Sequence, residues 1–166
     1  MHEIYLTQAL REFLEKTLEN FKMETSYFDC DGNVIYESPR VINGYAPPKE
    51  SRDEKDYSFV VVRPMRGSAD IDATEIKVDI IIGCFYPIED CDGCVVRPYD
   101  GHDLCLNVMG RIRTALCELP ERTLNRKYQL RLPTEWDLPE EHPYPFWQIV
   151  LSTTWLINTP RNIDDF

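Results

Sequence analysis

The spacing of hydrophobic and polar residues predicts one helix near the start of the chain and another in its second half. Over residues 2–23 the hydrophobic positions recur at three- and four-residue steps: Leu6, Leu10, Phe13, Leu14 and Phe21. This spacing is typical of an amphipathic helix. The same spacing returns after residue 100, where we expect Asp100 to cap a second helix and Pro120 to end it.

Period-two alternation predicts the strands, which we place at 58–63, 75–86, 127–132 and 146–157. The clearest is 75–86, whose inward face is Ile76, Val78, Ile80, Ile82 and Cys84. Its other face is polar at the start and apolar at the end, which predicts a strand that is covered at one end only. In 127–132 the inward residues are expected to be Tyr128, Leu130 and Leu132, and in the last strand Ile149, Leu151, Thr153 and Trp155. The strands at 58–63 and 75–86 should pair antiparallel because their connection is short.

Turn signals separate these elements. The Asp31-Gly32 pair predicts a hairpin near 25–37, and residues 37–56 read as a long exposed loop. Shorter loops are expected at 66–72 and 87–99, and an acidic, proline-rich connection at 133–145. Strands in runs, with only two helices, indicate a single α+β domain over 1–166, with a mainly antiparallel sheet packed with two helices.

Composition narrows the class of protein. The chain has 166 residues, 43% of them hydrophobic, and 29 acidic against 18 basic side chains, a formal net charge of −11. This acidity argues against a general nucleic-acid binder, which needs a basic face. The first residues do not read as a secretory signal and no apolar run is long enough for a membrane span, so we expect reduced thiols in a cytoplasm.

One short motif has a spacing typical of metal-binding or redox sites, Cys91-x-x-Cys94. Such a pair suits zinc or redox chemistry, but the further ligands on offer, Cys84, His102 and Cys105, have spacings that no standard finger shows. Two loop thiols are the simpler interpretation. The acidic residues at 89–93 lack the closing glutamate of a calcium loop, and no nucleophile elbow or glycine-rich phosphate loop occurs. We therefore expect no metal, no cofactor and no catalytic residue, and hence no enzyme.

Aromatic residues gather in the last quarter of the chain, among them Trp136, Trp147 and Trp155. Most aromatics at strand positions belong to the core. The proline-flanked stretch at 143–147 also suits the anchoring of a partner, and both interpretations stay open.

Charge is divided unevenly along the chain. Residues 86–103 carry five acids and one base (−4), residues 104–132 six bases and two acids (+4), and residues 133–142 four acids and no base (−4). A solvated helix face explains the basic segment. A head-to-tail contact between copies, in which the basic segment of one meets an acidic loop of the next, explains it equally and would close into a ring where the rotation permits.

Several motifs from residue 57 onward occur together. They are a strand at 57–64 that closes in Arg-Pro, a long strand at 78–83, a helix opened by residues 100–103 that carries Arg111 and Arg113, the pair Leu132-Pro133, and Trp136, residues 145–147 and Trp155 around the last strand. This pattern resembles the tail terminator (tail completion) proteins of long-tailed bacteriophages and prophage-derived particles. Cys91 and Cys94 depart from that pattern.

The resemblance implies a structural virion protein. Members of this family are small α+β domains that form hexameric rings at the head-proximal end of the tail tube. The ring stops tube growth and joins the tail to the head or neck connector, and DNA passes through its lumen without sequence-specific binding. Partners would be further copies, the tail tube protein, the connector and, in a contractile tail, the sheath. Assembly would take place in the host bacterial cytoplasm, with no membrane involved.

Two alternatives remain at this point. Another phage neck or head–tail connector protein would share the size and acidity of this chain. A small cytoplasmic enzyme with no recognisable site is the other.

The divided charge generates a prediction that does not depend on the resemblance. We expect the protein to form a ring whose stability falls as salt is raised, because salt screens contacts between exposed charges. Mass measurement by light scattering at low and high salt tests this. A strict monomer at high protein concentration would contradict it.

Overall fold

The structure, a computed structural model, describes residues 2–45, 57–70, 73–87, 100–140 and 145–158. Within these ranges the helices are α1 (His2–Leu18) and α2 (Asp100–Cys117), with a short 3₁₀ turn η1 (Pro120–Arg122). The strands are β1 (Met23–Phe28), β2 (Val34–Glu37), β3 (Arg40–Asn43), β4 (Phe59–Ala69), β5 (Ala73–Phe85), β6 (Thr123–Leu124), β7 (Tyr128–Asp137) and β8 (Phe146–Asn158). The fold is α+β, as the sequence predicts.

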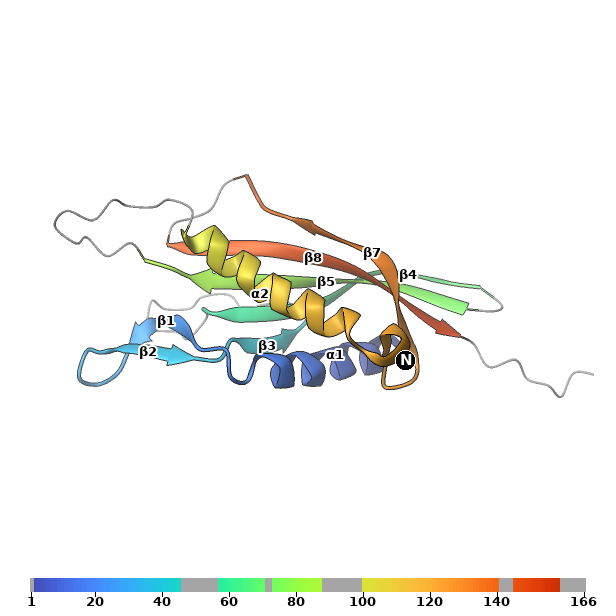
Figure 1. The fold of residues 1–166 in the computed structure, drawn as a ribbon, viewed down its shortest axis with the longest axis horizontal. Coiled ribbons are helices and arrows are strands. Elements are labelled where there is room, and N and C mark those ends of the chain that lie inside the picture. The colour runs from blue at the N-terminus through green and yellow to red at the C-terminus, as the bar shows by residue number, and fades with distance from the viewer. Residues whose placement is uncertain (1, 46–56, 71–72, 88–99, 141–144, 159–166) are drawn as a thin grey trace, which may run out of the picture.

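The main sheet has six strands in the order β3-β4-β5-β8-β7-β6, and β1 with β2 forms a separate two-stranded sheet. Every pairing in the main sheet is antiparallel except that of β3 with β4. The centre is β5 against β8, which pair along their whole length, from Ala73 opposite Asn158 to Phe85 opposite Phe146. Both helices lie on one face of this sheet (Figure 1).

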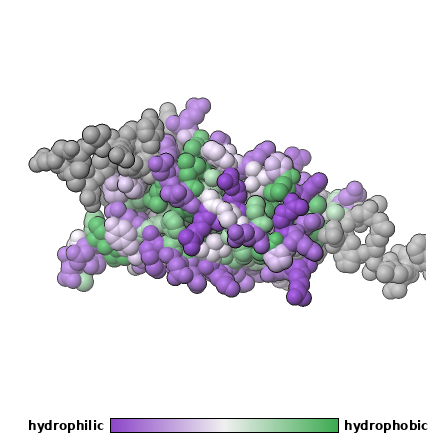
Figure 2. Space-filling model, in the orientation of Figure 1, coloured by the Kyte–Doolittle hydropathy of each residue, from purple (hydrophilic) through white to green (hydrophobic). Residues whose placement is uncertain are grey.

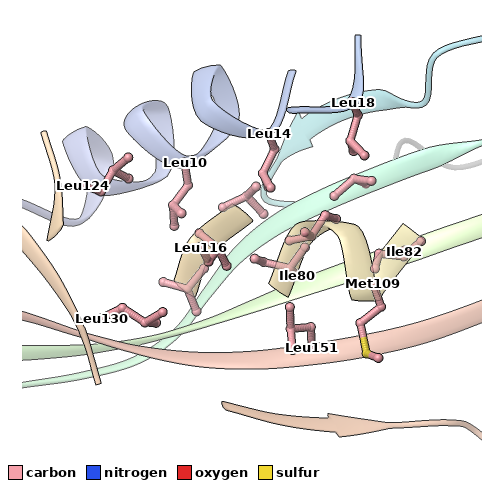
Figure 3. Packing of buried hydrophobic residues seen from close by; sticks show 14 of the residues in the cluster. Leu10, Leu14, Leu18, Ile80, Ile82, Met109, Leu116, Leu124, Leu130 and Leu151 are labelled. Carbon is pink, nitrogen blue, oxygen red and sulfur yellow. The ribbon is translucent and has the colours of Figure 1, made fainter. Parts of the chain in front are cut away.

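The core lies between that face and the helices. Leu10, Leu14 and Leu18 of α1 and Leu116 of α2 point toward the sheet, where Ile80, Ile82 and Leu151 meet them (Figure 3). The inward residues predicted for 75–86 and 146–157 are all buried. Burial of this kind stabilises a fold by about 25 cal/mol per Å² of apolar surface. The polar Thr153 is satisfied within the core: its hydroxyl donates to the Val78 carbonyl (2.8 Å) and accepts from the Trp155 indole N–H (2.9 Å).

The opposite face of the sheet changes character along β5, as its sequence predicts. At one end Glu75 and Lys77 meet solvent. At the other end the Phe59 ring lies over Gly83, so close that a Cβ there would be 2.4 Å from its Cζ. The Tyr57 ring packs against those of Phe59 and Phe146 (centroids 4.8 and 4.4 Å apart) and extends this aromatic cover.

The predicted hairpin near 25–37 forms from β1 and β2. Its turn is organised by Asp29, whose carboxylate accepts the N–H groups of Asp31 (2.9 Å) and Asn33 (2.8 Å). These hydrogen bonds, that from Asn33 foremost, lower the pKa of Asp29 because they favour the charged carboxylate. Gly32 has φ +82°, which explains why glycine follows aspartate here.

Two predictions from the first part of the chain are wrong. The helix predicted over 2–23 ends at Leu18, where the chain turns so that the Phe21 N–H donates to the Leu18 carbonyl (2.9 Å) and the next apolar residue, Met23, is buried in β1. The loop predicted over 37–56 contains β3, a four-residue edge strand parallel to β4. Four residues give too short a pattern to be recognised without their distant partner. The rest of that loop, 46–56, lies outside the described residues.

Three further predictions, on β4 and β7, are also wrong, and each follows from a register shift beside a proline. The loop expected at 66–72 is strand as far as Ala69, because the register shift between Pro64 and Arg66 absorbs the proline and pairing with β5 resumes. In β7 a second shift, between Arg131 and Glu135, absorbs Pro133. It carries the strand into the predicted connection at 133–145 and leaves Leu132, expected inside, 50% exposed.

Two glycines of α2 offer a matched test of this packing. A Cβ on Gly101 would lie 2.2 Å from the Trp147 indole nitrogen, whereas one on Gly110 would meet nothing within 4 Å. We expect Gly101→Ala to lower the free energy of unfolding by about 1–3 kcal/mol through overpacking, and Gly110→Ala to raise it by about 1 kcal/mol through helix propensity. Urea unfolding at high salt measures both, and equal effects of the two substitutions would contradict the packing described.

Candidate interaction surfaces

A groove runs between the two helices on the outside of the molecule. It has a volume of about 730 Å³ and an apolar floor that includes Phe13, Ala115 and Leu119. Its charged lining residues are Lys16, Arg111 and Glu118. We call this the helical groove. It exists because small residues of α2, including Gly110, leave space where two larger side chains would meet.

A second surface lies on β7, near one edge of the sheet. In the described residues β6 pairs with β7 only at Tyr128 and Gln129, so the rest of that strand has no neighbour on its outer side. Trp136 is 47% exposed there, on the face of the sheet that the helices cover, because it pairs with Leu151. Its exposed neighbours Glu135 and Asp137 pair with Ser152 and Val150 and point to the opposite, open face. We call the exposed side chain of Trp136 the tryptophan ridge. Figure 2 shows hydrophobic patches set among hydrophilic side chains on the molecular face that carries α2.

A third surface is a shallow furrow of about 500 Å³ on the open face of the sheet. Charges of both signs line it, and most are already engaged. Arg131 of β7 donates to the carboxylate of Glu75 on β5 (2.9 Å), so the pair spans β8. The Ser152 hydroxyl of β8 donates to the Asp79 carboxylate of β5 (2.8 Å). Such an exposed ion pair contributes little to stability, about 0–1 kcal/mol. The furrow offers paired charges rather than a free ligand site.

The cysteines fall into two groups. Cys84 of β5 and Cys105 of α2 are fully buried and contact each other, whereas Cys30 and Cys117 are exposed. The hydrogen bond with Cys105, together with burial, raises the pKa of Cys84 well above its ordinary value. The thiol is therefore neutral at physiological pH and a poor nucleophile.

Of the candidate zinc ligands, Cys84, His102 and Cys105 lie within the described residues. Cys91 and Cys94 lie outside the described residues, and so does the acidic stretch at 89–93. His102 packs edge-on against Trp147 (centroids 4.7 Å apart) one turn before Cys105. Among the described residues no group of three or more His, Cys, Asp or Glu side chains gathers as a metal site requires.

The aromatic stretch at 143–147 is divided between the described and undescribed parts of the chain. Phe146 and Trp147 are half-buried, and Phe146 packs on Tyr57 and Phe85. The packing of these two residues supports the interpretation that they contribute to the core. Among the described aromatics of this region Trp136 is exposed; it falls in the connection expected at 133–145 and was not predicted to be exposed. Its position between two acids was the signal that could have identified it.

The basic segment at 104–132 is spread over the surface. Arg111 and Arg113 are exposed on α2, whereas Arg131 pairs with Glu75. Arg111 also lies over the Phe21 ring, 5.5 Å from its centroid. Most of the acidic segment at 86–103 lies outside the described residues. The acidic segment at 133–142 is represented by Glu135, Asp137 and Glu140, all exposed.

Comparison with known proteins adds no relative: no model of a protein family matches the chain, and no curated protein matches it. Within the described residues, no helix has the length and apolar character needed to cross a membrane.

The two cysteine groups generate a prediction. At about pH 8 iodoacetamide should label Cys30 and Cys117 rapidly, because both thiols are exposed and accessible to the reagent. Cys84 and Cys105 should be labelled only when the protein unfolds. Mass spectrometry of the alkylated peptides reports each residue separately. Labelling of Cys84 in the folded protein as fast as Cys117 would contradict the assignment.

Proposed function

We propose that this protein is a tail terminator of a long-tailed bacteriophage or a prophage-derived particle, with no enzymatic activity. Copies form a ring, expected to be hexameric, at the head-proximal end of the tail tube. The ring stops tube growth and joins the tail to the head or neck connector. Its partners are other copies, the tube protein and the connector, with the sheath added in a contractile tail. Assembly takes place in the host cytoplasm and the protein ends in the virion.

The observation that carries this proposal is that one small α+β unit presents two unlike surfaces. The helical groove is apolar with Lys16 and Arg111 on its lining, whereas the tryptophan ridge presents an exposed indole from β7. Unlike surfaces on one chain favour head-to-tail association, which generates closed rings or open filaments. A ring that caps a tube needs this kind of self-association, and the sequence motifs from residue 57 onward supply the resemblance to the family.

Net acidity fits the place proposed for the ring. A lumen lined with carboxylates repels phosphates, so DNA crosses it without being held. A protein that gripped DNA would need the opposite charge. The formal charge of −11 therefore suits a protein that works beside DNA.

Particles assembled without the protein test the function. We expect their tail tubes to vary in length and to extend beyond the normal value, because nothing stops the addition of tube subunits. Electron microscopy of tails from a deletion strain measures this, with the same strain carrying the wild-type gene on a plasmid as control.

The outcomes separate the alternatives. Normal tube length with tails detached from heads would refute the terminator role and favour another neck or connector protein. Normal particles in normal numbers would refute any virion role and favour the small cytoplasmic enzyme.

A further inference from the structure

We propose that the main sheet continues from one copy of the protein to the next. The outer edge of β3 in one copy pairs antiparallel with the outer edge of β7 in its neighbour, so that the sheets of all copies join around the ring. The inference rests on the proposed function, because it names the contact that builds the ring.

The outer edge of β3 carries backbone groups that point away from its own sheet. The N–H groups of Arg40 and Gly44 donate toward β4, over 3.1 and 2.8 Å. Because backbone groups alternate in direction along a strand, Val41 and Asn43 turn their N–H and C=O groups outward. Among the described residues β3 is the last strand on that side of the sheet, so these groups can bond to an added strand.

A hollow of about 620 Å³ follows this edge. Residues 38–43 line it from both faces of β3, and α1 borders it with Arg11 and Glu15. A strand added to the sheet would lie about 4.8 Å from β3. The hollow therefore leaves room for side chains of such a strand beside β3 and α1.

The outer edge of β7 is open where this contact needs it. β6 pairs with β7 only at Tyr128 and Gln129, far from the end that carries Trp136. The pairings across the sheet make β3 and β7 run in opposite directions, and the two strands lie toward opposite edges (Figure 1). Copies joined edge to edge around a ring keep those directions, so β3 meets β7 antiparallel.

The register of β3 fixes which of its side chains lie on each face. Val41 pairs with Val60, which is buried beneath the helices, and Arg40 pairs with Phe59 on the open face. Paired residues of neighbouring strands share a face, and successive residues alternate. β3 therefore presents Val41 on the face of α1 and the exposed Arg40 on the open face.

The faces of β7 match those of β3. Trp136 lies on the helix-covered face, and Glu135 and Asp137 lie on the open face. In a continuous sheet Trp136 of the neighbour reaches the hollow beside Val41 and α1, where its half-exposed indole is removed from water. On the open face the two carboxylates come beside Arg40, and opposite charges on neighbouring strands stabilise the pairing.

Charge selects this pairing over the two symmetric ones. Two β3 edges together would place Arg40 of both copies on one face, and two β7 edges would gather the carboxylates of both copies. Like charges on neighbouring strands destabilise a pairing, whereas β3 with β7 brings opposite charges together. A contact between unlike edges is head-to-tail, the kind that closes into a ring.

Cysteine cross-linking tests the contact, in a protein in which every cysteine except the buried Cys84 and Cys105 is replaced by serine. One variant adds Arg40→Cys with Glu135→Cys, and another adds Arg40→Cys with Asp137→Cys. We expect at least one of them to form disulfide-linked dimers, trimers and longer chains on mild oxidation. The reason is that residues opposite each other in an antiparallel pair are close enough for a disulfide. Gels without reductant display this ladder.

Two controls use the same background. Arg113→Cys with Asp137→Cys, in which one cysteine is exposed on α2, should give no ladder. Arg40→Cys alone should give no dimer, because a head-to-tail contact keeps the Arg40 positions of neighbouring copies apart. A dimer from Arg40→Cys alone would overturn the proposal in favour of a two-fold contact.

Light scattering on the same proteins separates the contact from the ring. If the background protein assembles and neither double variant gives a ladder, the contact is overturned and the ring stands. If the free protein is monomeric, the cross-linking is carried out on purified tails, and protein present there without a ladder overturns the contact alone. Normal tube length in the deletion strain overturns the proposed function, and a ladder in solution would still support the contact.

Discussion

The pairing of β5 with β8 is the interaction on which the rest of the structure depends. Both strands have thirteen residues and pair without a register shift. Because side chains alternate along a strand, this unbroken register puts every inward residue of both strands on the same face. The buried hydrogen bonds from Trp155 to Thr153 and from Thr153 to Val78 fix the register further, since a slip of one residue would leave polar groups unsatisfied in the core.

The other elements are placed by that face. Both helices cover it, and the shorter strands extend the sheet on either side. The placement of α2 over β5 and β8 has two consequences for the surface. It forms the helical groove with α1 on one side, and it leaves β7 at the other side with Trp136 exposed. The helical groove and the exposed Trp136 are thus products of one packing arrangement.

The helical groove combines apolar area with charge. An exposed apolar groove alone would favour aggregation, and exposed charges alone bind weakly. In the groove Lys16 and Arg111 border the apolar floor, whereas on β7 the exposed Glu135 and Asp137 point away from Trp136, to the other face of the sheet.

The sequence by itself determined the inward face of the sheet, both helices, the β1–β2 hairpin and the division of charge, because each follows from local periodicity or a local turn. It did not determine β3, the length of β4 or the exposure of Leu132, because an edge strand and two register shifts depend on partners far away in the chain. The contact of Cys84 with Cys105, the helical groove and the exposure of Trp136 were decided only by the tertiary structure. Phe13 and Ala115 are about a hundred residues apart, and no local pattern records that α1 and α2 lie side by side on one sheet.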